Sequence, residues 1–136
     1  MRHIIIGAGA AGIQAAKTIR ANQPDAAIVM ISTDSFVHSR CMLHRYLSHE
    51  RDEAALSFIP ENFFEKENIL WLKNSTVTSI DTSEQTVTVG NGTVFSYDKL
   101  LIATGANSFI PPVGNFREAN NVFGLRHLSD AQRIRP

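Results

Sequence analysis

The sequence predicts an α/β protein in which a central parallel sheet is accompanied by a three-stranded antiparallel meander. Two observations predict this class. Near the start of the chain, short β-branched runs flank a helical stretch, the pattern of parallel strands joined by a crossover. From residue 76 onward, Thr- and Val-rich runs separated by turns are typical of antiparallel strands. Both patterns lie in one chain of 136 residues, which is enough for one domain with a sizeable core.

The first predicted unit is a strand, a helix and a second strand. An apolar run that ends at Gly7 is typical of a buried parallel strand. In the helical stretch, Ile13, Ala16 and Ile19 are spaced three apart, so they share one face. Such a unit has right-handed parallel connectivity almost without exception. The predicted bounds are His3–Ile6, Ala10–Asn22 and Ile28–Ile31.

The remaining elements are shorter. Pro60 suits the first turn of a helix, and Asn91-Gly92 strongly indicates a hairpin turn. Helical stretches are predicted near Met42–Leu47 and Pro60–Lys66. The predicted strands are Ile69–Leu72, then Thr76–Ile80, Thr86–Val89 and Thr93–Phe95 of the meander, and finally Lys99–Ala103.

Composition excludes several classes of function. Thirteen basic and thirteen acidic side chains cancel, so no net field attracts the chain to nucleic acid or to an anionic membrane. One cysteine and five histidines without ligand spacing predict no metal site. No stretch approaches the roughly 20 apolar residues of a membrane span, and the apolar run near Met1 is too short for a signal peptide. We therefore expect a cytoplasmic protein.

The segment Gly7-x-Gly9-x-x-Gly12 is a glycine turn placed between a predicted strand and a predicted helix. Backbone N–H groups at a helix N-terminus can hold a pyrophosphate, and the helix dipole assists. Gly7 allows the tight turn, Gly9 lets the backbone approach the phosphates, and Gly12 lets the helix pack closely. This context favours a dinucleotide site over a turn with no ligand. The predicted binding residues are Gly7, Gly9, Ala10, Ala11 and Gly12.

An acidic side chain after the second strand is the next requirement, because it accepts a hydrogen bond from a ribose hydroxyl. Asp34 lies 22 residues beyond Gly12, close to the expected spacing. Thr33 is the neighbouring candidate if the register differs by one residue. The alternative interpretation of Asp34 is a helix cap or a turn aspartate.

Three further segments resemble the FAD-binding part of two-dinucleotide flavoprotein reductases. Thr76–Asp81 resembles the strand whose valine backbone faces adenine. Tyr97–Ala106 is similar to the second FAD-contacting motif, and Asn121–Asp130 to the segment leading into the NAD(H) domain. The resemblance implies an incomplete FAD-binding Rossmann-like domain of the glutathione-reductase type. The additional FAD-contacting residues that it implies are Val77, Ala103, Thr104 and Gly105.

Residues 39–47 most resemble the branch containing NADH oxidase, the NADH-dependent nitrite reductase flavin domain, rubredoxin reductase and coenzyme A disulfide reductase. That branch has a Tyr-x-Arg-Pro-x-Leu-Ser-Lys stretch beside the flavin ring. Arg40 matches its Arg, and Arg45 stands where its Lys would be. Cys41 replaces the Pro and His44 replaces the Ser. An Arg cannot lose its proton as a Lys can, so the flavin contacts differ in detail.

Cys41 has two interpretations. In the NADH oxidase and coenzyme A disulfide reductase members, a redox cysteine faces the flavin near this place and cycles through a sulfenic acid or a mixed disulfide. That resemblance makes Cys41 the candidate catalytic residue. Those members usually have Gly after the cysteine, whereas Met42 stands here. We therefore favour the alternative, a buried cysteine that packs as a small hydrophobe.

The resemblance implies a part of an enzyme that passes hydride from NAD(P)H to FAD and electrons on to a protein or small-molecule acceptor. Residues 1–110 would be the first half of a discontinuous FAD-binding domain, and residues 111–136 a linker toward an NAD(P)H-binding domain. We expect a fragment whose exposed sheet edge invites pairing into a homodimer. A stand-alone, non-catalytic nucleotide-binding module stays open as an alternative. A simple NAD-binding Rossmann protein is disfavoured, because such proteins continue with alternating helices and strands.

Overall fold

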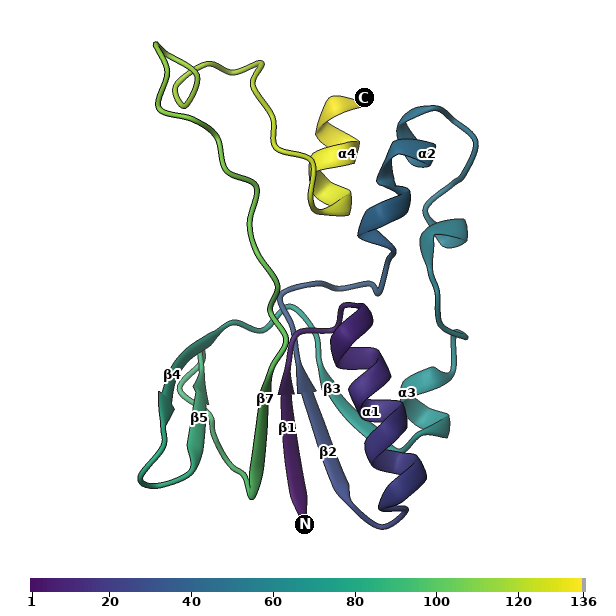
Figure 1. Cartoon of the computed structure of the whole chain (residues 1–136), viewed down its shortest axis with the longest axis vertical. Coiled ribbons are helices and arrows are strands. Elements are labelled where there is room, and N and C mark those ends of the chain that lie inside the picture. The colour runs from purple at the N-terminus through teal and green to yellow at the C-terminus, as the bar shows by residue number, and fades with distance from the viewer. Residues whose placement is uncertain (136) are drawn as a thin grey trace. The chain divides into compact units, whose positions relative to one another are not determined.

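The computed structural model describes residues 1–135 and divides into two compact units (Figure 1). The first unit contains residues 1–37 and 59–105, and the second contains residues 38–58 and the described residues from 106 onward. The chain therefore leaves the first unit at residue 38, returns to it at residue 59 and leaves it again at residue 106.

A four-stranded parallel sheet is the centre of the first unit. Its strand order is β3-β2-β1-β7, so the first strand in sequence lies inside the sheet. All three pairings are parallel, with Ile4 opposite Val29 on one side and Leu100 on the other. All four carboxyl ends therefore meet at one edge. The strands are β1 (Arg2–Ile6), β2 (Ala27–Ile31), β3 (Ile69–Leu72) and β7 (Lys99–Ile102).

The two faces of this sheet bury different side chains, because successive residues of a strand point to opposite faces. Ile5 faces the helices α1 (Ala10–Asn22) and α3 (Phe63–Lys66), where it packs with Ile13 and Met30. Ile4 and Ile6 belong to the opposite core cluster, which contains two valines of the meander. The helices and the meander consequently lie on opposite faces of the parallel sheet (Figure 1).

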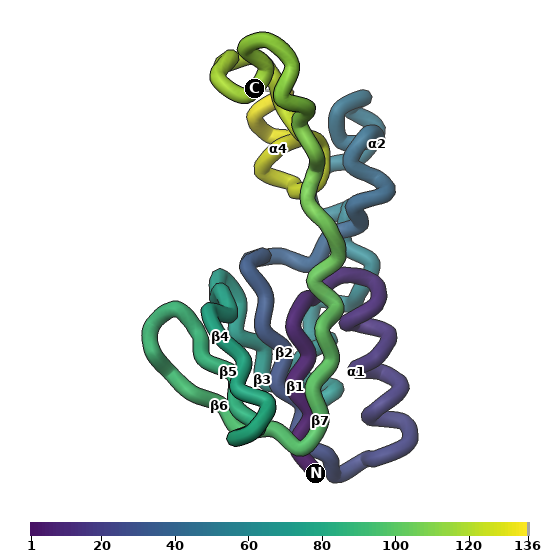
Figure 2. The backbone as a smooth tube through the Cα atoms, turned by 60° about the vertical axis from the view of Figure 1, so that its left-hand side comes forward, coloured from purple at the N-terminus to yellow at the C-terminus, as the bar shows by residue number. Residues whose placement is uncertain are grey.

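The antiparallel meander has the order β4-β5-β6, and Figure 2 shows it beside the parallel sheet. In the first turn, the Asp81 side chain accepts hydrogen bonds from the Ser83 and Glu84 N–H groups, both at 2.9 Å. In the second turn, Gly92 has φ +83°, and Asn91 accepts a hydrogen bond from Thr93 N–H at 2.9 Å. The hairpin predicted at Asn91-Gly92 is therefore confirmed. The strands are β4 (Val77–Asp81), β5 (Thr86–Val89) and β6 (Val94–Ser96).

The second unit is formed by short helices around a small core of Leu43, Leu56 and Ala131. Helix α4 begins after His127, and the Asp130 carboxylate accepts hydrogen bonds from the N–H groups of Arg126 and His127 at 2.9 and 2.8 Å. Burial opposes ionisation of Asp130, but these hydrogen bonds outweigh it and lower its pKa. The elements are η1 (Arg40–Met42), α2 (Leu43–Leu47), η2 (Ala54–Leu56) and α4 (Leu128–Ile134).

Most predicted elements agree with the structure. The helix bounds Ala10–Asn22 are confirmed, and every predicted strand matches to within one residue at each end. The placement of Pro60 in a first helical turn is wrong: α3 begins at Phe63, and the Pro60 carbonyl accepts a hydrogen bond from Phe63 N–H in the preceding turn. Helix α4 was not predicted, because a histidine cap is not among the preferred N-cap residues.

Within residues 1–135, the structure has no helix that is both long enough and apolar enough to cross a membrane.

Replacing Ile5 by Ala should destabilise the protein by about 3 kcal/mol, because a fully buried isoleucine between sheet and helix leaves a cavity. Ile102→Ala is the matched control, since Ile102 is 60% exposed on strand β7. Its cost should stay below about 1 kcal/mol. Urea unfolding followed by circular dichroism measures both free energies. Equal losses of unfolding free energy in the two variants would contradict the assignment of Ile5 to the core.

Candidate functional site

The glycine turn connects β1 to α1 at the carboxyl edge of the parallel sheet. Gly7 N–H donates a hydrogen bond to the Ile31 carbonyl at 2.8 Å, which ties the turn to the end of β2. Gly7 has φ +113°, and a Cβ atom on it would collide with the Ala103 backbone carbonyl. A glycine is therefore required here both by the backbone conformation and by the close approach of the β7 end.

Gly9 and Gly12 have different surroundings. A Cβ on Gly12 would collide with the Gly7 carbonyl oxygen, so Gly12 permits close packing of helix and turn. A Cβ on Gly9 would meet nothing within 4 Å. Gly9 is also the N-cap of α1, with no side-chain capping bond and no acidic residue in the first turn. The open space beside this uncapped helix N-terminus fits a bound pyrophosphate, because the first-turn N–H groups lack intrahelical partners.

Ala103, Thr104 and Gly105 follow β7 directly and lie next to the glycine turn. Ala103 N–H donates a hydrogen bond to the Ile6 carbonyl at 2.8 Å, at the last residue of β1. Gly105 has φ +68°, a conformation that glycine adopts without strain. Two predicted motifs far apart in sequence are thus brought together at one edge of the sheet.

Thr33 and Asp34 lie in the segment that leaves β2 at the same edge. Thr33 is exposed and Asp34 is half-buried. The Asp34 carbonyl accepts hydrogen bonds from Asn74 N–H and the Ser32 hydroxyl, both at 3.3 Å. The carboxyl ends of adjacent parallel strands form the crevice where nucleotides bind in open α/β sheets. The structure therefore places this acidic residue in the region that the sequence predicts.

Val77 lies in the meander rather than in the parallel sheet. It pairs with Val89 across β4 and β5, and its half-buried side chain packs against the core cluster of the meander face. The Thr76 carbonyl beside it accepts a hydrogen bond from Gly90 N–H at 2.9 Å.

Arg40, at the start of η1, has structural contacts within the second unit. Its Nη1 donates a hydrogen bond to the Arg126 carbonyl at 3.0 Å and lies 2.8 Å from Nδ1 of His127. Arg40 therefore anchors the segment that precedes α4. Sequence reasoning did not identify these contacts, because 86 residues separate Arg40 from Arg126.

Cys41 and Arg45 also belong to the second unit, and both are exposed. The interpretation of Cys41 as a buried packing residue is wrong, since η1 leaves its side chain accessible in this chain. Arg45 forms an ion pair with Glu50. A hydrogen bond from Ser48 and the charge of Arg45 lower the pKa of Glu50.

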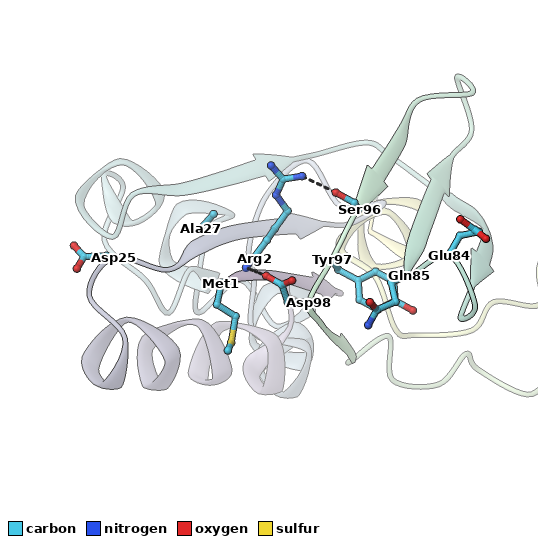
Figure 3. A pocket seen from close by; sticks show the side chains of 9 residues that line it. All are labelled: Met1, Arg2, Asp25, Ala27, Glu84, Gln85, Ser96, Tyr97 and Asp98. Carbon is cyan, nitrogen blue, oxygen red and sulfur yellow. Dashed lines mark hydrogen bonds between the residues drawn. The ribbon is translucent and has the colours of Figure 1, made fainter.

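A hollow of the first unit lies elsewhere (Figure 3). It has a volume of about 570 Å³ and surrounds the amino ends of β1 and β2. Arg2 lines this hollow. Its backbone N–H donates a hydrogen bond to the Asp98 carboxylate at 2.6 Å, and its guanidinium donates one to the Ser96 hydroxyl at 2.9 Å. The glycine turn lies at the opposite ends of these parallel strands, and its backbone geometry makes that edge the candidate site. No cluster of metal-binding side chains occurs within residues 1–135.

The pyridine nucleotide-disulphide oxidoreductase family model matches residues 1–136. The chain therefore belongs to this family of FAD-dependent oxidoreductases that use NAD(P)H. An NADH oxidase from Methanocaldococcus jannaschii is 33% identical over 141 residues, covering 98% of this chain and 31% of the relative. A rubredoxin-NAD(+) reductase from Pseudomonas putida is 33% identical over 138 residues, covering 99% of this chain and 35% of the relative.

Solved structures agree with this assignment. The reductase in a covalent putidaredoxin reductase–putidaredoxin complex superposes with a TM-score of 0.89 at 30% identity, over 98% of this chain and 33% of that one. The NADH:rubredoxin oxidoreductase from Clostridium acetobutylicum gives 0.83 at 30% identity, over 98% of this chain and 34% of that one. The predicted fold class is confirmed. The chain spans about a third of the length of the curated relatives it matches.

Replacing Gly12 by Ala should destabilise the protein by about 2–3 kcal/mol, because the new methyl group would overlap a backbone carbonyl that cannot rotate away. Ala11→Ser is the matched control: it changes the neighbouring exposed position of the same helical turn. Thermal unfolding compares the two variants with the parent chain. A Gly12→Ala variant as stable as the parent would contradict the close contact between helix and turn.

Proposed function

We propose that this chain is the FAD-binding portion of an NAD(P)H-dependent flavoprotein oxidoreductase. One observation carries the proposal: the glycine turn, with open space at Gly9, lies against Ala103 at the carboxyl edge of a parallel sheet. Family membership supports the same activity. The flavin supplies hydride acceptance when bound, and the protein binds and orients it.

Within this proposal, the backbone N–H groups of the first α1 turn bind the FAD pyrophosphate, and Asp34 accepts a hydrogen bond from the adenosine ribose. Val77 presents its backbone to the adenine. The residues that complete the FAD site are Gly7, Gly9, Ala10, Ala11, Gly12, Thr33, Ala103, Thr104 and Gly105. Arg40 and Arg45 are proposed to contribute near the flavin ring.

An electron acceptor and a second copy of the chain are the further partners that we propose. Relatives are named for rubredoxin and putidaredoxin, which supports a small redox protein as the acceptor. Strand β7 is an edge strand, and its Leu101 and Ile102 are exposed. Such an edge favours pairing with another strand, which supports a homodimer. A non-catalytic nucleotide-binding module is the alternative.

Titration of FAD into the purified chain tests this proposal. Binding with the absorbance shift of a protein-bound flavin is the expected result. In a protein that joins this chain to an NAD(P)H-binding domain, NADH or NADPH should then bleach the flavin absorbance. If such a protein binds FAD but its flavin is not reduced, that result would favour the non-catalytic module. A protein that ignores added FAD would contradict the assignment itself.

Replacing Gly9 by Ala should weaken FAD binding by at least about tenfold, because the added methyl group fills the space through which the phosphates approach the backbone. Stability should change by less than about 1 kcal/mol, since nothing lies within 4 Å of the new Cβ. FAD titration and thermal unfolding of the same preparation separate the two effects. Unchanged FAD affinity in a folded variant would exclude a pyrophosphate at this position.

Cys41→Ser distinguishes the proposed catalytic role of Cys41 from mere exposure. FAD binding should persist, because Ser keeps the size of the side chain. In a protein that joins this chain to an NAD(P)H-binding domain, loss of peroxide or disulfide reduction would support a redox thiol. Such a thiol passes through a sulfenic acid or a mixed disulfide, which Ser cannot form. Stopped-flow assays with each acceptor measure this. Full activity of the variant with every acceptor would show that Cys41 takes no part in the reaction.

A further inference from the structure

Ser32 is the first residue beyond β2, and its backbone is tied to the chain after β3. It is only 6% exposed. Its N–H donates a hydrogen bond to the Leu72 carbonyl at 3.1 Å, and its carbonyl accepts one from Ser75 N–H at 2.8 Å. The β2 end is therefore held in place one residue past the last ladder pair, Ile31 with Leu72.

The hydroxyl group of Ser32 connects an aromatic side chain to Asp34. It accepts a hydrogen bond from the Trp71 indole N–H at 3.0 Å and is within 3.3 Å of the Asp34 carbonyl oxygen, to which it donates. A serine hydroxyl has one donor and can accept as well, so both bonds form at once. The indole bond orients the hydroxyl, and the hydroxyl bond orients the backbone of Asp34.

Trp71 is itself held by aromatic packing that reaches the core. Its ring stacks on Phe64 with centroids 4.2 Å apart and an interplanar angle of 16°. Phe64 meets Phe63 edge-on, with centroids 5.2 Å apart, and Phe63 is 3% exposed in the core cluster under α1. The indole N–H therefore points at Ser32 from a fixed ring.

We propose that Ser32 and Trp71 are positioning residues that hold Asp34 where its carboxylate receives the ribose hydroxyl of a bound dinucleotide. The inference rests on the proposed function, because it requires a dinucleotide at the glycine turn. Asp34 lies beyond β2, where ladder hydrogen bonds no longer hold the chain. A binding group on such a segment needs supporting hydrogen bonds to keep its geometry. The Trp71–Ser32–Asp34 chain supplies them, together with the hydrogen bond from Asn74 N–H to the Asp34 carbonyl.

The test compares the binding of ADP with that of 2′-deoxy-ADP. The two nucleotides differ only by the ribose 2′-hydroxyl, which is the group that Asp34 is proposed to bind. The parent chain should prefer ADP by about tenfold, the size expected for a hydrogen bond to a charged group. In the Ser32→Ala and Trp71→Phe variants, the ratio of the affinities for ADP and 2′-deoxy-ADP should fall toward one, mainly because ADP binds more weakly. Trp71→Phe keeps an aromatic ring and removes only the N–H donor. Isothermal calorimetry measures both affinities.

Two further variants serve as controls. Ser83→Ala removes the same hydroxyl from an exposed turn and should keep the full preference for ADP. The double variant Ser32→Ala/Trp71→Phe should lose no more than Ser32→Ala alone, because both changes break one shared contact. Circular dichroism establishes that each variant is folded. If Ser32→Ala unfolds, Trp71→Phe still decides the outcome.

The outcomes separate this inference from the proposed function. A folded Trp71→Phe variant with the parent preference for ADP would overturn the positioning role. Equal weakening of both nucleotides would also overturn it, since that result reports a general structural role. Equal affinities of the unmodified chain for both nucleotides would show that Asp34 does not bind the 2′-hydroxyl, which overturns this inference while leaving dinucleotide binding intact. A parent chain that binds neither would overturn the proposed function and this inference together.

Discussion

The close approach of three backbone segments at the end of β1 is the constraint on which the site depends. The turn at Gly7 lies against the backbone of Ala103, and helix α1 at Gly12 lies against the turn itself. Neither approach leaves room for a side chain. Because hydrogen bonds from Gly7 to Ile31 and from Ala103 to Ile6 fix the same geometry, the two candidate binding motifs adopt one arrangement. The helix N-terminus then has a defined position relative to the β7 end.

This arrangement requires a well-packed sheet beneath it. The alternation of Ile4, Ile5 and Ile6 directs one side chain toward the helices and two toward the meander, so both faces are covered. A parallel sheet needs such cover on both sides. The meander provides this cover and also contains Val77. Packing and the proposed adenine contact thus use the same small sheet.

The candidate site differs from the hollow near Arg2 because the two features have different causes. The hollow near Arg2 lies where strand ends and turns meet, and its polar groups already bond to one another: the Arg2 backbone N–H donates to Asp98 and the Arg2 guanidinium to Ser96. At Gly9, the N-cap of α1, a Cβ atom would meet nothing within 4 Å, so the space beside the helix N-terminus is open. Open space beside unpaired N–H groups favours an anionic ligand.

The sequence by itself determined the strands, helix α1, the glycine turn and the fold class, because these depend on local periodicity and on the conformational freedom of glycine. It also placed Asp34 just beyond the carboxyl end of β2. Only the tertiary structure decided that Cys41 is exposed, that Arg40 bonds the segment before α4, and that Trp71 reaches Ser32. These features depend on how residues that are distant in sequence come together, and no local sequence pattern encodes that. The capping of α4 by His127 is local, but the residue type gives no helix signal.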